Sequence, residues 1–266
     1  MFDSGYGGLT VLKEIAAHLP GYDYLYMGDN ARAPYGPRSF QQVYEYTLEA
    51  VKWFFTQGCP LVVLACNTAS AKALRTIQQN DLEKIAPGKR VLGVIRPTAE
   101  VIGNYTNTGN VGILGTKGTV LSGSYILEIE KFAPHVKVSQ EACPMWVPLI
   151  ENNEHQNPGA DYFVKQHIDN LLTLNNKIDT VLLACTHYPL LANKITRFLP
   201  GGIQLVEQGE IVAKSLVNYL ERHPEIAEKC SKTGKIEFFT TGEPADFDEH
   251  AAIFYGKPVK SMRVEL

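Results

Sequence analysis

The chain has 266 residues, 45% of them hydrophobic and 20% charged, so it is long enough to bury one large core or two smaller ones. The net charge is −3, and the lysines and arginines are scattered along the sequence, so the chain shows no cluster of basic residues of the kind that binds nucleic acid. No apolar run approaches the roughly 20 residues of a membrane helix, and MFDSGYGG does not resemble a secretion signal, so we expect a soluble, cytoplasmic protein with a small-molecule partner.

Apolar runs alternate with stretches of helical spacing along the chain. Helical spacing is clear at 9–19, where Leu9, Leu12 and Ile15 recur, and weaker at 43–55. The predicted strands are 22–27, 61–65, 91–95, 111–114, 181–184, 203–206 and 236–240. This alternation predicts an α/β protein whose parallel sheets are covered by helices.

Two pairs of segments repeat. LVVLACNTAS (61–70) matches TVLLACTHYP (180–189), and FDSGYGGLTVL (2–12) matches ILGTKGTVL (113–121) as strand, glycine-rich turn and helix. We therefore expect two related, pseudosymmetric α/β domains, with the chain crossing between them near 93–98 and 203–209. The predicted first domain is discontinuous, 1–94 and 208–266, and the second is 95–207.

The repeat places functional side chains at the ends of strands. In open parallel sheets, ligands bind beyond the carboxyl ends of the strands, where Asp3, Cys66, Thr116 and Cys185 are expected. Two such edges facing each other would form a cleft with one cysteine on each wall.

The chain has five cysteines: Cys59, Cys66, Cys143, Cys185 and Cys230. Their odd number and the absence of a CxxC pair favour free thiols in a reducing compartment and argue against a metal site. A single strand-end cysteine is more often a packed small hydrophobe than a catalyst. Cys66 and Cys185 differ from a single cysteine of this kind. Each lies where a helix is expected to begin, and the helix dipole favours the thiolate there.

Opposed thiols suit the removal of a proton from one face of a carbon and the return of one to the other face. With an ordinary pKa of about 8.5, a thiol can serve as base or as acid near neutral pH. The pattern thus favours racemisation or epimerisation without a cofactor. The spacing of Gly5, Gly7 and Gly8 does not fit the G-x-G-x-x-G loop of nicotinamide sites. We interpret Cys59, Cys143 and Cys230 as structural.

Polar groups near the two cysteine turns could hold a substrate carboxylate and stabilise enolate charge. Backbone N–H groups at both turns, with the hydroxyls of Ser4, Thr68, Thr116 and Thr186, are the candidates. Asp3 could orient a cysteine or bind an ammonium group, or it could simply form the turn. His187 could tune Cys185, or its ring could be satisfied by a backbone carbonyl.

Six motifs in chain order closely resemble the glutamate racemases of the aspartate/glutamate racemase superfamily. They are FDSGYGGLTVL, GDNARAPYG (28–36), ACNTASA (65–71), GILGTKGTV (112–120), CPMWVPLIE (143–151) and ACTHYPLL (184–191). The resemblance covers nearly the whole chain. It implies cofactor-independent interconversion of L- and D-glutamate, a role in supplying D-glutamate for peptidoglycan, and two pseudosymmetric domains around the site; a homodimer is compatible with it.

The resemblance also implies roles for individual residues. Cys66 would deprotonate D-glutamate and Cys185 would deprotonate L-glutamate, each acting as the acid in the other direction. Asp3, Asp29, Glu151 and His187 would support the thiols or the substrate ammonium. The implied substrate-binding residues are Asp3, Ser4, Pro34, Tyr35, Gly36, Asn67, Thr68, Thr116, Thr119, Thr186 and His187.

Three alternatives remain at this point. The first is a racemase of aspartate or another amino acid in the same superfamily. The second is a hydrolase with Cys185 as nucleophile and Asp3 or Asp29 orienting His187, which would leave Cys66 without a role. The third is a non-catalytic binding or regulatory protein, against which the two intact cysteine turns argue.

Overall fold

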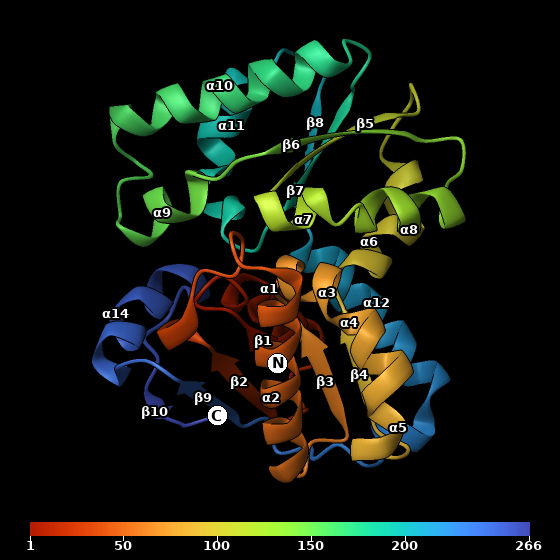
Figure 1. The fold of residues 1–266 in the computed structure, drawn as a ribbon, viewed down its shortest axis with the longest axis vertical. Helices are drawn as coiled ribbons and strands as arrows, with labels where there is room; N and C mark the ends of the chain where they lie inside the picture. The colour runs from red at the N-terminus through yellow and green to blue at the C-terminus, as the bar shows by residue number, and fades with distance from the viewer.

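The computed structural model describes residues 1–266 and contains two parallel β-sheets in two stacked halves (Figure 1). The larger sheet has the strand order β10-β9-β2-β1-β3-β4, and the smaller has β6-β5-β7-β8. The strands are β1 (Phe2–Asp3), β2 (Tyr24–Gly28), β3 (Leu61–Leu64), β4 (Arg90–Gly93), β5 (Asn110–Gly115), β6 (Lys137–Ala142), β7 (Thr180–Ala184), β8 (Gln204–Val206), β9 (Ile236–Thr240) and β10 (Ser261–Arg263).

Helices cover both sheets, as expected for parallel sheets. The α-helices are α1 (Leu9–His18), α2 (Phe40–Thr56), α3 (Asn67–Lys72), α4 (Leu74–Thr76), α5 (Leu82–Ile85), α6 (Ile95–Val101), α7 (Lys117–Leu121), α8 (Ser124–Phe132), α9 (Trp146–Glu151), α10 (Pro158–Leu174), α11 (Ala192–Phe198), α12 (Gly209–Arg222), α13 (Pro224–Ala227) and α14 (Pro244–Tyr255). Short helical turns are η1 (Asn30–Arg32), η2 (Ile77–Asp81), η3 (Ile102–Asn104) and η4 (Tyr188–Leu191). No helix is long and apolar enough to cross a membrane.

The two sheets repeat one topology. The order β2-β1-β3-β4 in the larger sheet matches β6-β5-β7-β8 in the smaller, so β1 corresponds to β5 and β3 to β7. Strands β9 and β10 are additions at one edge of the larger sheet. The internal duplication expected from the sequence is therefore confirmed in the strand order.

The chain crosses between the halves twice. Strands β1 to β4 belong to the larger sheet, β5 to β8 to the smaller, and β9 and β10 to the larger again. The crossings lie between β4 and β5 and between β8 and β9. Helices α3 and α7 pack against each other where the halves meet (Figure 1).

All seven predicted strands are present, with shifts of a few residues at their ends. The prediction of a strand up to Ile95 is wrong, because α6 begins there; Pro97, near the helix start, needs no intrahelical N–H partner. Strands β6 and β10 were missed. Both are edge strands, and the half-exposed sequence KVSQEA of β6 gives no apolar run.

Candidate active site

Side chains at the carboxyl ends of four strands meet where the two halves face each other. Asp3 ends β1, Cys66 follows β3, Thr116 follows β5 and Cys185 follows β7. Because β1 corresponds to β5 and β3 to β7, the two cysteines occupy equivalent places in the two halves. The structure thus brings together the strand ends that the sequence singled out.

Cys66 caps the N-terminus of α3. Its sulfur accepts a hydrogen bond from the Ala69 N–H at 3.4 Å and donates one to Ser4 Oγ at 3.5 Å. The thiol is 5% exposed, and burial raises its pKa to about 12, with the charges of Asp3 and Cys185 adding to the shift and the Ala69 N–H and the Ser4 hydroxyl opposing it. At neutral pH this group is therefore a neutral thiol.

Cys185 forms one end of a chain of three functional groups. Its sulfur lies 4.0 Å from His187 Nδ1, and His187 Nε2 lies 3.0 Å from Glu151 Oε1. Burial disfavours the imidazolium, but interactions with Cys185 and Glu151 prevail and raise the pKa of His187 to about 10. The ring is therefore a cation at neutral pH, with one N–H directed at the sulfur and the other at the carboxylate.

Asp3 ties the β1 turn to the cysteine turn of the other half. Its carboxylate accepts from the Gly5 N–H at 3.0 Å and from Thr186 Oγ1 at 3.2 Å, while Thr10 Oγ1 donates to the Thr186 carbonyl at 3.0 Å. Asp3 is fully buried, and desolvation raises its pKa, although the nearby His187 charge and the hydrogen bonds from Gly5 and Thr186 oppose the shift.

Gly7 permits this close approach. A Cβ at Gly7 would stand 2.3 Å from Thr186 Oγ1 and 2.4 Å from His187 Nδ1, so a side chain there would push the two turns apart. The glycine-rich turn therefore serves backbone-to-side-chain packing across the halves, which agrees with its poor fit to a dinucleotide loop.

Hydroxyl groups from both halves form a second junction. Thr68 Oγ1 lies 2.9 Å from Thr116 Oγ1 and 3.4 Å from Thr119 Oγ1, and the latter two are 3.1 Å apart. Thr116 also caps α7, as Cys66 caps α3. Asn67 lies beside this cluster in the chain, and its side-chain Nδ2 is buried with no hydrogen-bond partner.

Asp29 is held by neighbours in its own half. It accepts hydrogen bonds from Arg32 Nε at 2.8 Å, from Thr241 Oγ1 at 2.7 Å and from the Tyr35 hydroxyl. Through its bonds to Arg32 and Tyr35, Asp29 braces the segment that carries Pro34, Tyr35 and Gly36. That segment reaches the other half, because a Cβ on Gly36 would stand 3.1 Å from Thr116 Cβ.

Three buried polar residues near the site were missed by sequence reasoning. Lys72, on α3, donates from Nζ to the Arg38 carbonyl at 2.6 Å, and burial lowers its pKa. Tyr125 and Gln208 form a hydrogen-bonded chain with Asn67. No local pattern marks these residues, since Tyr125 falls at an ordinary apolar position of a helix and Gln208 in a polar loop.

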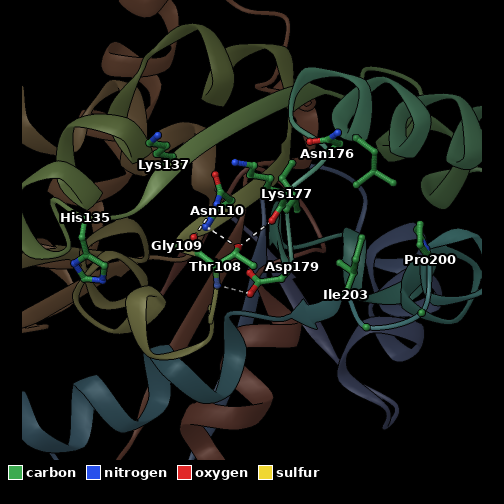
Figure 2. Close-up of a pocket in the computed structure, with 14 residues that line it drawn as sticks. Thr108, Gly109, Asn110, His135, Lys137, Asn176, Lys177, Asp179, Pro200 and Ile203 are labelled. Atoms are coloured by element: carbon green, nitrogen blue, oxygen red, sulfur yellow. Dashed lines mark hydrogen bonds between the residues drawn. The ribbon is translucent and has the colours of Figure 1, made fainter.

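Two cavities lie elsewhere in the molecule. One of about 730 Å³ lies at the amino ends of the strands of the smaller sheet, among Thr108, Asn110, Lys137 and Lys177 (Figure 2). The Asp179 carboxylate in this cavity already accepts hydrogen bonds from backbone N–H groups of the adjacent loop. The other, of about 500 Å³, lies at the start of β2 and β3 and is mainly apolar. Both thiols are only 5–6% exposed, so the site is closed in this structure.

These features define a two-half α/β protein with paired thiols at equivalent strand ends, a site suited to proton transfer. The family model for Asp/Glu/Hydantoin racemase matches residues 9–216. A glutamate racemase from Streptococcus pyogenes serotype M3 is 39% identical over 99% of this chain and 97% of its own length. The chain therefore belongs to the Asp/Glu/Hydantoin racemase family.

Solved structures agree with this assignment. A glutamate racemase isoform from Bacillus anthracis is 34% identical, with a TM-score of 0.89, over 100% of this chain and 96% of its own. A glutamate racemase from Francisella tularensis, solved with D-glutamate, is 27% identical, with a TM-score of 0.86, over 99% and 96% of the two chains.

Proposed function

We propose that this protein interconverts L- and D-glutamate by a two-base mechanism in which Cys66 and Cys185 act on opposite faces of the α-carbon. The observation that carries the proposal is the equivalence of the two thiols: each follows the same strand of a repeated sheet, and both are buried where the halves meet. The whole-length similarity to glutamate racemases supports glutamate as the substrate.

In the proposed reaction, the Cys185 thiolate removes the α-proton of L-glutamate while the Cys66 thiol donates a proton to the opposite face. D-glutamate results, Cys66 becomes the thiolate and Cys185 the thiol, so the reverse reaction starts from the state that the forward reaction leaves. No cofactor is required for this exchange of protons.

The surrounding groups tune the two thiols. The His187 imidazolium faces the Cys185 sulfur, and Glu151 holds the ring in its protonated state. Cys66 sits near Asp3, whose charge opposes its ionisation. An incoming amino acid brings an ammonium group, and its positive charge next to Asp3 would offset that effect.

The carbanion formed at the α-carbon needs stabilisation of negative charge on the carboxylate. The N-terminus of α3, the hydroxyls of Thr68, Thr116 and Thr119, and the Asn67 NH2 group provide donors within one small region. Ser4, Tyr35, Thr186 and the Pro34–Gly36 turn complete the proposed substrate-binding set. These assignments remain predictions.

We further propose that the two α/β domains are residues 1–94 with 208–266 and residues 95–207. This division follows the strand membership of the two sheets. A cytoplasmic enzyme that supplies D-glutamate for peptidoglycan is the biological role that this activity would serve. A homodimer stays a prediction, which light scattering on the purified protein would test.

Proton NMR in deuterated water tests the reaction directly. Reduced protein is incubated separately with L- and D-glutamate, without added cofactor, while the α-proton signal and the enantiomer ratio are followed. Loss of the α-proton together with approach to equal amounts of both enantiomers is the expected result. Folded protein with reduced thiols that gives neither exchange nor inversion would overturn the proposal.

The same assay separates the alternatives. Activity on aspartate but not on glutamate would indicate the other racemase of the superfamily. For the hydrolase alternative, the expectation that Asp3 or Asp29 orients His187 is not met, because Glu151 is hydrogen-bonded to the ring; a hydrolase would use the Cys185–His187–Glu151 chain instead. That reading predicts release of product from an ester or amide substrate, with no effect of Cys66 substitution.

A further inference from the structure

The side-chain amide of Asn67 is held at one end only. Its Oδ1 accepts a hydrogen bond from the Tyr125 hydroxyl at 2.6 Å, whereas its Nδ2 has no partner although the residue is only 2% exposed. A buried donor without a partner is energetically unfavourable, and such groups are rare unless they serve a function. This donor belongs to the residue that directly follows Cys66, at the start of α3.

The orientation of the Asn67 amide is set by Gln208, which acts through Tyr125. Gln208 Nε2 lies 2.7 Å from the Tyr125 hydroxyl, and an amide nitrogen can only donate. The hydroxyl oxygen therefore accepts from Gln208 and gives its single proton to Asn67 Oδ1. With its oxygen fixed in this way, Asn67 presents its NH2 group on the side away from Tyr125.

Gln208 is itself fixed by the two crossings between the halves. Its Nε2 lies 2.8 Å from Thr98 Oγ1 and 3.2 Å from the Val94 carbonyl, and the Thr98 hydroxyl donates to the same carbonyl at 3.1 Å. Val94 and Thr98 follow β4 on the outward crossing, and Gln208 follows β8 on the return. All of these residues are buried, so water does not compete for their bonds.

We propose that Tyr125 and Gln208 are positioning residues that aim the Asn67 NH2 group at the substrate carboxylate. The inference rests on the proposed racemase function and deepens it. Neither residue touches the reacting atoms; Gln208 sets the direction of the Tyr125 proton, and that proton sets the orientation of Asn67. This series of hydrogen bonds begins at the two crossings between the halves, so the path of the backbone there is linked to the orientation of the Asn67 amide.

The proposal makes a specific kinetic prediction. L- and D-glutamate are mirror images in equilibrium at equal amounts, so any variant must keep kcat/KM equal in the two directions. A hydrogen bond to the carboxylate is already made to the bound substrate and persists during proton transfer, so its loss raises KM; the part of it that strengthens as charge develops on the carbanion would appear as an additional, smaller fall in kcat. Losing one hydrogen bond to a charged group corresponds to a roughly tenfold or larger effect.

Tyr125→Phe is the main test, because it deletes the directing proton and keeps the ring. We expect KM to rise about tenfold or more for both enantiomers with a smaller change in kcat. The matched control is Tyr24→Phe, which loses a hydroxyl bonded to the Leu19 carbonyl at 2.7 Å, at the amino end of β2 and away from the thiols. Its KM should match that of the wild type.

Gln208→Met separates positioning from packing. Tyr125 keeps its proton and can still donate to Asn67, so the KM of this variant should rise less than that of Tyr125→Phe. The double variant should behave like Tyr125→Phe alone, because Gln208 then has no route to Asn67. Calorimetric titration of D-glutamate provides a second readout that does not depend on turnover.

The outcomes are distinct. Wild-type protein without racemisation contradicts the proposed function. Active wild type with an unchanged KM in Tyr125→Phe, or KM effects that multiply in the double variant, overturns the positioning role. A purely structural role would lower the melting temperature of Tyr125→Phe and the amount of active enzyme while leaving KM unchanged, which also counts against the proposal.

Discussion

Substitution of Gly7 by alanine should open the contact between the halves. The added Cβ would stand 2.3 Å from Thr186 Oγ1 and 2.4 Å from His187 Nδ1, far inside ordinary contact distance. Overpacking of this kind is unfavourable by about 1–3 kcal/mol. If Thr186 also loses its hydrogen bond to Asp3, about 1 kcal/mol is added. We therefore expect Gly7→Ala to lower the free energy of unfolding by about 2–4 kcal/mol.

Thermal unfolding and racemisation kinetics measure this effect. For a chain of this size, 1 kcal/mol corresponds to roughly 2–4 °C, so the melting temperature should fall by about 5–15 °C. A displacement of Thr186 and His187 by about 1 Å would lower turnover by up to about 10²-fold. Gly21→Ala is the control, since a Cβ there meets nothing within 4 Å. If Gly7→Ala matches the control in both assays, the packing argument is wrong.

Further substitutions test the thiols and their partners. Cys66→Ser and Cys185→Ser should each reduce racemisation by about 10²-fold or more, because a hydroxyl is a poor replacement for a thiol acid or base; near-normal turnover in either variant would contradict the two-base scheme. Cys66→Ser should still exchange the α-proton of L-glutamate with deuterium without inverting it, as followed by NMR. The pKa of His187 is raised from 6.5 to about 10, so its stabilising contribution is complete below about pH 6.5 and is lost as the pH rises toward 10. Urea unfolding of wild type and His187→Gln should accordingly differ most near pH 6.5 and least near pH 10; a constant difference would refute the charged state. Glu151→Gln should shift that loss of stability to lower pH, because it removes the carboxylate that stabilises the imidazolium.

Much of the fold could be predicted from local sequence. Buried parallel strands such as LVVL and TVLLA are continuous apolar runs, and the repeated cysteine turns predicted the duplication. Strands β6 and β10 could not be found this way, because edge strands are half-exposed and carry polar residues. The strand order 2-1-3-4 in each half is likewise a tertiary property that no single segment records.

The candidate site, like the fold, could be predicted from the sequence only in part. The strand-end positions of Cys66 and Cys185 were visible in the sequence, because their chemistry and local structure coincide. The partnership of His187 with Glu151 joins residues 36 apart and depends on the packing of α9 against the cysteine turn. Tyr125 and Gln208 carry no motif at all; they act through hydrogen-bond direction, which only a folded network specifies.

The bonds between Asp3 and Thr186 and among the threonine hydroxyls have a consequence for the rate of the reaction cycle. Both thiols are 5–6% exposed while these bonds are made, so the proposed substrate would reach or leave them only if the halves separate. The same hydroxyls that would hold the carboxylate therefore resist each entry and each departure. A variant with stronger bonds between the halves would bind substrate more slowly and retain its product longer. Solvent viscosity would then determine its turnover rate more than the acidity of its thiols.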